Sequence, residues 1–189
     1  MSTLFFVLDV AVAMAIPLVV IALARRGTIP TSSWPLLWVG TLIGFTWELT
    51  LLFLGPRYVA NPVYVLAATF PGPTAAQPMI HALWDGWFLV IGLAIAHRLV
   101  PGPGLQRFSW RQLGVLLLWA QLQSLGVEAL AAWAGAWSFA QTDWNPVLVP
   151  IGAGGVSLLP QLIWLVAPLP FYAASLWVQR RVQGDRGEA

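Results

Sequence analysis

The sequence predicts an all-α fold, a single-domain bundle of five transmembrane helices. Hydrophobic residues make up 59% of the 189 residues and charged residues only 8%, whereas soluble domains carry about 25% charged residues. Five apolar runs have the roughly 20 residues that a bilayer crossing needs. The basic residues, all arginines, cluster at the ends of these runs. We therefore expect an integral, multi-pass membrane protein, and we attribute its net charge of +2 to topology rather than to nucleic-acid binding.

The apolar runs and the turns between them give the expected elements in order. The spans are expected at about 4–24, 35–55, 79–98, 113–136 and 157–178. Turn chemistry separates them: GTIPTSS, LGPR, VPGPG and IGAGG. Two arginines follow the first run instead of preceding it, so we expect a membrane helix there and not a signal peptide. The polar segment 179–189 is expected to be a frayed tail.

The arginines predict the orientation. Eight of the nine fall in the first connection, the third connection and the tail, which share one side of a five-span topology: Arg25, Arg26, Arg98, Arg107, Arg111, Arg180, Arg181 and Arg186. Arg57 alone falls on the other side. The positive-inside rule then places the N-terminus outside and the C-terminus in the cytoplasm. The connection 56–78, with five prolines, fits either an interfacial loop or a lid over a cavity, and segment 137–156 lies at the same end.

Four acids fall within the expected spans, although acids are costly in hydrocarbon and usually face a bundle interior or a wet cavity. Glu48, Asp85 and Glu128 lie three or four residues from the midpoints of their spans, always on the outer side. At 1.5 Å per residue, these offsets are about 4–6 Å and define one layer. Asp9 lies slightly nearer the surface, where a structural role is favoured. Convergence from several helices predicts one polar pocket in the outer half of the bundle.

Helical spacing selects further candidates around this pocket. His81 and Asp85 are four residues apart and share a helix face, as do Gln121 and Glu128 at seven residues. The predicted catalytic residues are Glu48, Asp85, Glu128 and His81, and the predicted substrate-binding residues are Trp47, Trp84, Gln121, Gln161 and Trp164. A structural role stays open for each group. His81 could lie at the level of the lipid headgroups, the glutamines could only form hydrogen bonds between helices, and the tryptophans could only pack in the core.

Several kinds of site are not indicated. The chain has no cysteine, hence no disulfide framework and no thiolate metal site. It lacks the HExxH spacing, and we expect no metal. It also lacks G-x-S-x-G, P-loop and dinucleotide-binding motifs, and we expect no cofactor.

Buried acids beside tryptophans fit one reaction class. A carboxyl in an apolar pocket can donate a proton, and an ionised neighbour can accept one. Tryptophan faces stabilise cations. Such a pocket is suited to protonating an alkene, holding the carbocation and removing a proton elsewhere, which is isomerisation or cyclisation without a cofactor.

The last expected span, PQLIWLVAPLPFYAA, resembles the last helix of the emopamil-binding and sterol Δ8–Δ7 isomerase superfamily, the EXPERA fold. Gln161, Trp164 and Pro168 match its amide, Trp and Pro pattern. The segments HALWDGWFLVIG and QSLGVEALAAW are similar to its third and fourth helices. The resemblance implies a five-helix fold and a sterol-like ligand.

The chain departs from that family in its second and third helices. Trp47 and Leu51 stand where the family has His and Glu, and Gln77 aligns with its third-helix Glu. Glu48 is thus a different acid. The Trp47–Glu48 pair also resembles that of small integral-membrane terpene cyclases.

The leading hypothesis is cofactor-free acid–base isomerisation or cyclisation of a sterol-like or isoprenoid lipid in an outer-half pocket. A non-catalytic sterol- or lipid-binding membrane protein would use the same pocket. A proton-coupled transporter of a small lipophile would need access from both faces, yet the inner half carries no acid within a span. The expected partners are a hydrophobic small molecule or lipid and the membrane, and a homodimer is compatible with such a bundle.

Overall fold

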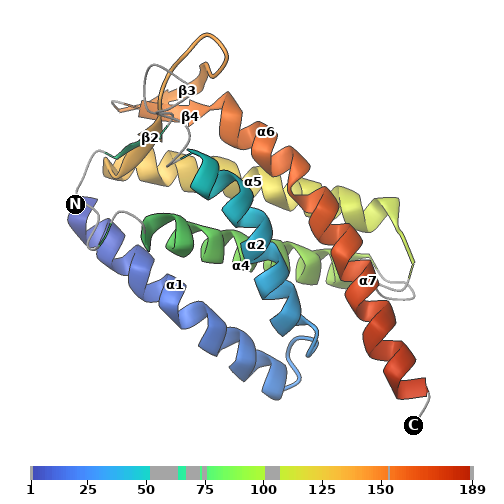
Figure 1. Ribbon diagram of the computed structural model, residues 1–189. Helices are drawn as coiled ribbons and strands as arrows, with labels where there is room; N and C mark the ends of the chain where they lie inside the picture. The colour runs from blue at the N-terminus through green and yellow to red at the C-terminus, as the bar shows by residue number, and fades with distance from the viewer. Residues whose placement is uncertain are drawn as a thin grey trace.

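The computed structural model describes residues 2–51, 64–66, 73, 76–100, 107–152 and 154–187. The chain is mostly helical in these residues. The helices are α1 (Ser2–Arg25), α2 (Ser33–Leu49), α4 (Ala76–Leu99), α5 (Trp110–Ala134), α6 (Leu158–Val166) and α7 (Pro168–Gly187). The strands are β1 (Tyr64–Leu66), β2 (Trp137–Phe139), β3 (Val147–Ile151) and β4 (Gly154–Ser157). Figure 1 shows the strands β2, β3 and β4 near the start of α1, while the C-terminus lies at the opposite end of the molecule.

Four stretches among the described residues are long and apolar enough to cross a membrane. They are Leu4–Arg25, Ala76–Leu99, Trp110–Ala134 and Leu158–Arg181. These stretches overlap the first, third, fourth and fifth expected spans. Helix α2 has 17 residues, which is shorter than the others, and residues 52–55 of the expected second span lie outside the described residues. The sequence prediction of a membrane protein therefore holds by length and composition.

The segment between α5 and α6 departs from the all-α expectation. β2 pairs antiparallel with β1 through Tyr64–Phe139 and Leu66–Trp137, and β3 pairs antiparallel with β4. Asn145 is buried in this region, where its Nδ2 donates to the Ala140 carbonyl at 2.9 Å and its Oδ1 accepts from the Leu159 N–H at 2.7 Å. These bonds fasten the loop to the first turn of α6. Most of the connection expected at 56–78 lies outside the described residues.

The ends of α5 and the end of the chain follow local chemistry. Ser109 caps the start of α5, where its Oγ accepts from the Gln112 N–H at 3.4 Å. Gly135 ends the helix with φ of 63°, a left-handed conformation that glycine adopts without strain. Helix α7 continues to Gly187, so the segment expected to be frayed is helical over most of its length.

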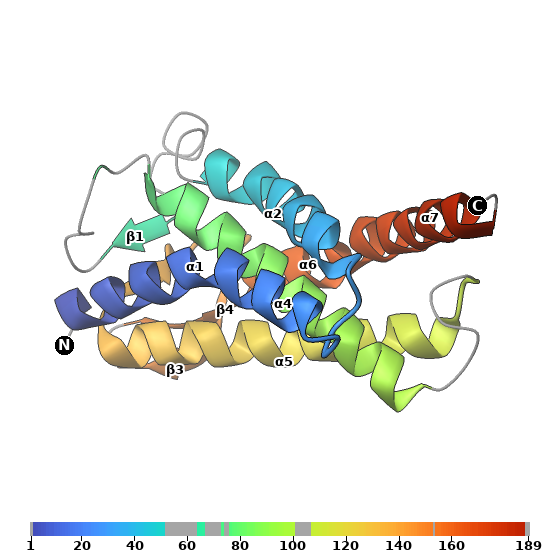
Figure 2. The same ribbon diagram turned by 90° about the horizontal axis from the view of Figure 1, so that it is seen from below.

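Helices α2 and α4 pack unusually closely at glycines. A Cβ placed on Gly40 would lie 2.7 Å from the Cα of Gly86, so only glycine permits this approach. Helices α2 and α4 run antiparallel, and each of them lines one side of the cavity described below. Figure 2 shows α1 passing over α4, with α2 on one side of these two helices and α5 on the other. One buried cluster, with Leu37, Leu89, Leu116 and Phe171, fills the bundle toward the C-terminal end.

Candidate functional site

A cavity of about 390 Å³ lies between α1, α2, α4, α5 and α6, near the end where the strands gather. This volume falls within the range of small-molecule sites, about 300–1,000 Å³. Seven of the nine residues chosen from the sequence line it: Trp47, Glu48, His81, Trp84, Asp85, Glu128 and Trp164. Residues that the sequence reasoning did not choose complete the wall: Phe5, Leu8, Asp9, Val12, Leu51, Phe88, Gln123, Ser124, Val127, Leu130, Trp137, Phe139, Pro160 and Ile163.

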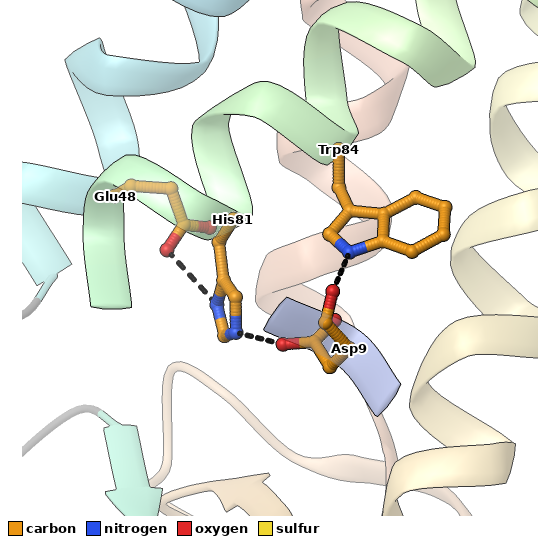
Figure 3. A network of polar contacts seen from close by, with 4 residues as sticks. All are labelled: Asp9, Glu48, His81 and Trp84. Atoms are coloured by element: carbon orange, nitrogen blue, oxygen red, sulfur yellow. Dashed lines mark hydrogen bonds and ion pairs between the residues drawn. The ribbon is translucent and has the colours of Figure 1, made fainter. Parts of the chain in front are cut away.

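The imidazole of His81 lies between two carboxylates that come from other helices. Its Nδ1 is 3.5 Å from Oε2 of Glu48 on α2, and its Nε2 is 3.7 Å from Oδ2 of Asp9 on α1. Figure 3 shows the ring between the two acids. All three side chains are only slightly accessible, at 12% for His81, 14% for Asp9 and 17% for Glu48. The arrangement is a carboxylate–imidazole–carboxylate array at the cavity wall.

Asp9 is the functional candidate that sequence reasoning missed. We interpreted it as a structural residue near the surface, because its depth differs slightly from that of the other acids. The structure brings it to the ring of His81, and the indole N–H of Trp84 donates to its backbone carbonyl at 3.4 Å. Both contacts hold α1 against α4. The available signal was that Asp9 is the one acid in the first apolar run.

Asp85 lies one turn beyond His81 on α4 and faces α2. The four-residue spacing predicted that His81 and Asp85 share a helix face. In the structure the ring nitrogens of His81 lie 3.5 Å and 3.7 Å from the carboxylates of Glu48 and Asp9, which come from other helices. The carboxyl of Asp85 packs against Gly44, where an added Cβ would meet Oδ2 at 2.7 Å. This Oδ2 is buried and accepts no hydrogen bond from the described residues.

Glu128 is the most completely hydrogen-bonded acid of the site. Ser157, which precedes α6, donates its Oγ–H to Oε1 at 2.8 Å and its backbone N–H to both carboxylate oxygens at 3.3 Å. Gln161 Nε2 donates to Oε2 at 2.8 Å. A carboxylate beside the first turn of a helix is further stabilised by the helix dipole. Glu128 thus fastens α5 to the start of α6.

The two glutamines chosen from the sequence do not line the cavity. Gln161 lies behind Glu128 as its donor, and Gln121 Nε2 donates to the Gln161 carbonyl at 3.1 Å. Both residues join α5 to α6 from outside the cavity. Ser157, the other donor to Glu128, had no helical periodicity to mark it, because it lies at the junction of β4 and α6.

Aromatic rings form a continuous wall on the side of the cavity away from the strands. Trp84 stacks on Phe88 with ring centroids 5.4 Å apart, and Phe88 meets Trp164 edge to face at 6.3 Å. Trp164 also meets Trp47 edge to face at 5.9 Å. Electron-rich ring faces attract positive charge. One cavity therefore combines an acid–imidazole array with an aromatic wall.

The chemistry that this arrangement permits is proton transfer in an apolar space. Acids are the prevailing ionisable groups among the described lining residues, where His81 is the one basic side chain. Among the described residues, no group of three or more His, Asp or Glu side chains is arranged to hold a metal ion. Comparisons of the chain with protein-family models, with curated proteins and with solved structures find no match.

Proposed function

We propose that the chain crosses the membrane five times, with α2 as the second span, the N-terminus outside and the C-terminus in the cytoplasm. The termini lie at opposite ends of the molecule (Figure 1), which is compatible with an odd number of crossings. The arginines at 25, 26, 98, 107 and 111 favour this orientation. The cavity then lies in the outer half of the bilayer.

The proposed function is cofactor-free acid–base isomerisation or cyclisation of a sterol-like or isoprenoid lipid in this cavity. The observation that carries it is the position of His81 between Glu48 and Asp9 inside a largely apolar cavity. An imidazole flanked by two carboxylates can hold a proton and pass it between them. Ionisable groups buried in a membrane protein are kept for function by default. The resemblance to the sterol isomerase superfamily stays a prediction that agrees with this proposal.

The proposed reaction balances without any co-reactant. A proton from the Asp9–His81–Glu48 array adds to one carbon of an alkene, forms a C–H bond and leaves a cation on the neighbouring carbon. The faces of Trp47, Trp84 and Trp164 stabilise that cation. A basic group of the same array, left unprotonated by the first step, then removes a proton from an adjacent carbon, and the double bond reappears at a new position. If the cation is first attacked by a second alkene, the product is a ring.

Glu128 receives a different role in this proposal. Its carboxylate oxygens already accept hydrogen bonds from Ser157 and Gln161. We propose that Glu128 positions α6, and with it Trp164, while the Glu48 side of the cavity carries the proton transfer.

The test is an incubation of the purified protein in heavy water with a panel of sterols and isoprenoids, read by mass spectrometry. Deuterium in a recovered lipid is the expected result. Glu48→Gln and Asp9→Asn should each lower its incorporation by about 10²-fold or more, the usual contribution of a positioned acid or base. Asp143→Asn makes the same change at an exposed loop acid outside the cavity and should have no effect.

Three outcomes would overturn the proposal. Full turnover in both the Glu48 and the Asp9 variants would remove the array from the chemistry. Absence of exchange with a lipid that demonstrably binds would favour a non-catalytic lipid-binding protein. Proton flux in liposomes that depends on Asp85 would favour a transporter.

A further inference from the structure

On α4, Phe88 is the innermost residue that lines the cavity, and this end of the cavity is called its floor below. The indole N–H of Trp119 donates to the Phe88 carbonyl at 2.8 Å, which places residue 119 of α5 opposite residue 88 of α4. One turn further along α4, a Cβ on Gly92 would meet Leu116 and Trp119, so the two helices run antiparallel here. The α5 residues that line the cavity begin at Gln123, about one turn outward of this level.

The space behind Phe88 is filled. Leu89 and Leu116 are buried within the main core cluster, and Trp119 packs over Gly92 so closely that an added Cβ would lie 2.4 Å from its ring. Protein interiors of this kind are packed to the density of organic crystals. A ligand in the cavity therefore cannot extend past Phe88 toward the C-terminal end of the bundle.

The ring of Phe88 is held on two sides. Trp84 stacks on it with an interplanar angle of 23°, and Trp164 meets its edge at 76°. Aromatic pairs with these geometries contribute stability beyond the area they bury. The floor of the cavity is thus fixed by contacts from α4 and α6 and does not swing aside freely.

We infer that Phe88 sets the length of lipophile that the cavity accepts, measured from the acid–imidazole array. His81 and Phe88 are seven residues apart on one helix, which corresponds to about 10 Å along its axis. The ligand class is a chain-like isoprenoid whose polar or reacting end lies at His81 and whose apolar end reaches the Phe88 ring. This inference rests on the proposed lipid cavity, but not on the proposed proton transfer.

The test is a binding series with geraniol, farnesol and geranylgeraniol, each one isoprene unit longer than the last. Competition for a photoreactive prenyl alcohol in detergent micelles gives relative affinities without requiring turnover. Phe88→Leu should shift the ratio of affinities toward the longer members by about tenfold or more, since one methylene too many in a closed apolar pocket costs about that much. Phe88→Trp should shift the ratio by a similar factor toward the shorter members.

Leu113→Val is the matched control, because it removes volume from a buried residue of the same core cluster that lies on α5, well inward of the cavity, and does not line it. It should leave the ratio unchanged. An unchanged ratio in both Phe88 variants, with each still competing for the probe, would overturn the inference even if deuterium exchange is observed. A shifted ratio of affinities without any deuterium exchange would support the role of Phe88 in setting ligand length and would overturn the proposed reaction. If Phe88→Leu does not fold, the Phe88→Trp result decides.

Discussion

The contact between α2 and α4 makes a quantitative prediction through Gly86. A methyl group added there by Gly86→Ala would lie 2.6 Å from the Leu37 carbonyl oxygen and 2.8 Å from the Thr41 backbone nitrogen. Contact of ordinary length begins at 3.4 Å, so the Leu37 oxygen must move by 3.4 − 2.6, or 0.8 Å. Since that oxygen belongs to the α2 backbone, the movement displaces the helix and not only a side chain.

The displacement reaches the candidate site because α2 carries Glu48. Glu48 lies 3.5 Å from the His81 ring, and His81 is on α4 with Gly86. A misplacement of about 1 Å can cost about 10²-fold in rate. Overpacking of this kind also costs about 1–3 kcal/mol of stability. Gly86→Ala should therefore lower both the free energy of unfolding and deuterium incorporation into the lipid.

Gly126→Ala is the control, since it makes the same substitution in a membrane helix where no atom lies within 4 Å of the new methyl group. It should be neutral or should stabilise α5 by up to about 1 kcal/mol, because alanine is the better helix former. Denaturant unfolding in detergent measures the free energy of unfolding, and mass spectrometry measures deuterium incorporation into the lipid. Wild-type stability and exchange in Gly86→Ala, or equal damage in Gly126→Ala, would refute the reasoning.

Two further predictions concern the α6 anchor and the orientation. Ser157→Ala removes a donor to a buried carboxylate and should lower the free energy of unfolding by about 1–3 kcal/mol, more than Gln121→Ala, whose bond is only partly buried; equal losses in denaturant unfolding would contradict this. Because the chain has no cysteine, Thr28→Cys and Gln141→Cys can report sidedness. In right-side-out vesicles an impermeant maleimide should label only Gln141→Cys, and labelling of Thr28→Cys alone would reverse the orientation.

The common level of three acids along the bundle could be predicted from the sequence, whereas their contacts could not. A fixed rise per residue converts sequence position into depth, which is why Glu48, Asp85 and Glu128 line one cavity. Which acids meet the ring of His81 depends on how each helix is rotated about its axis. In a membrane protein the lipid-facing side is as apolar as the packed side, so hydrophobic periodicity does not reveal that rotation.

The contact of α1 with the site illustrates this limit. Asp9 reaches His81 because α1 presents the face carrying Phe5, Leu8 and Val12 to the cavity. Leu8 and Val12 are nevertheless 56% and 45% exposed. Because both faces of α1 are apolar, the sequence alone did not show which face packs against the bundle, and Asp9 was interpreted as a residue near the surface.

Glu48 and Glu128 show how one residue type can serve two purposes at one depth. Glu128 is 3% exposed, and neutral donors from Ser157 and Gln161 occupy its oxygens. Removing such a carboxylate leaves several buried donors unpaired, which costs stability whatever the cavity contains. The side chain of Glu48 is more accessible. It lies beside the ionisable ring of His81, which Asp9 also approaches. Because the ring of His81 can itself carry a proton, Glu48 is able to exchange a proton with a ligand through it. Glu128 is held by neutral donors and is suited to keeping α6 in place.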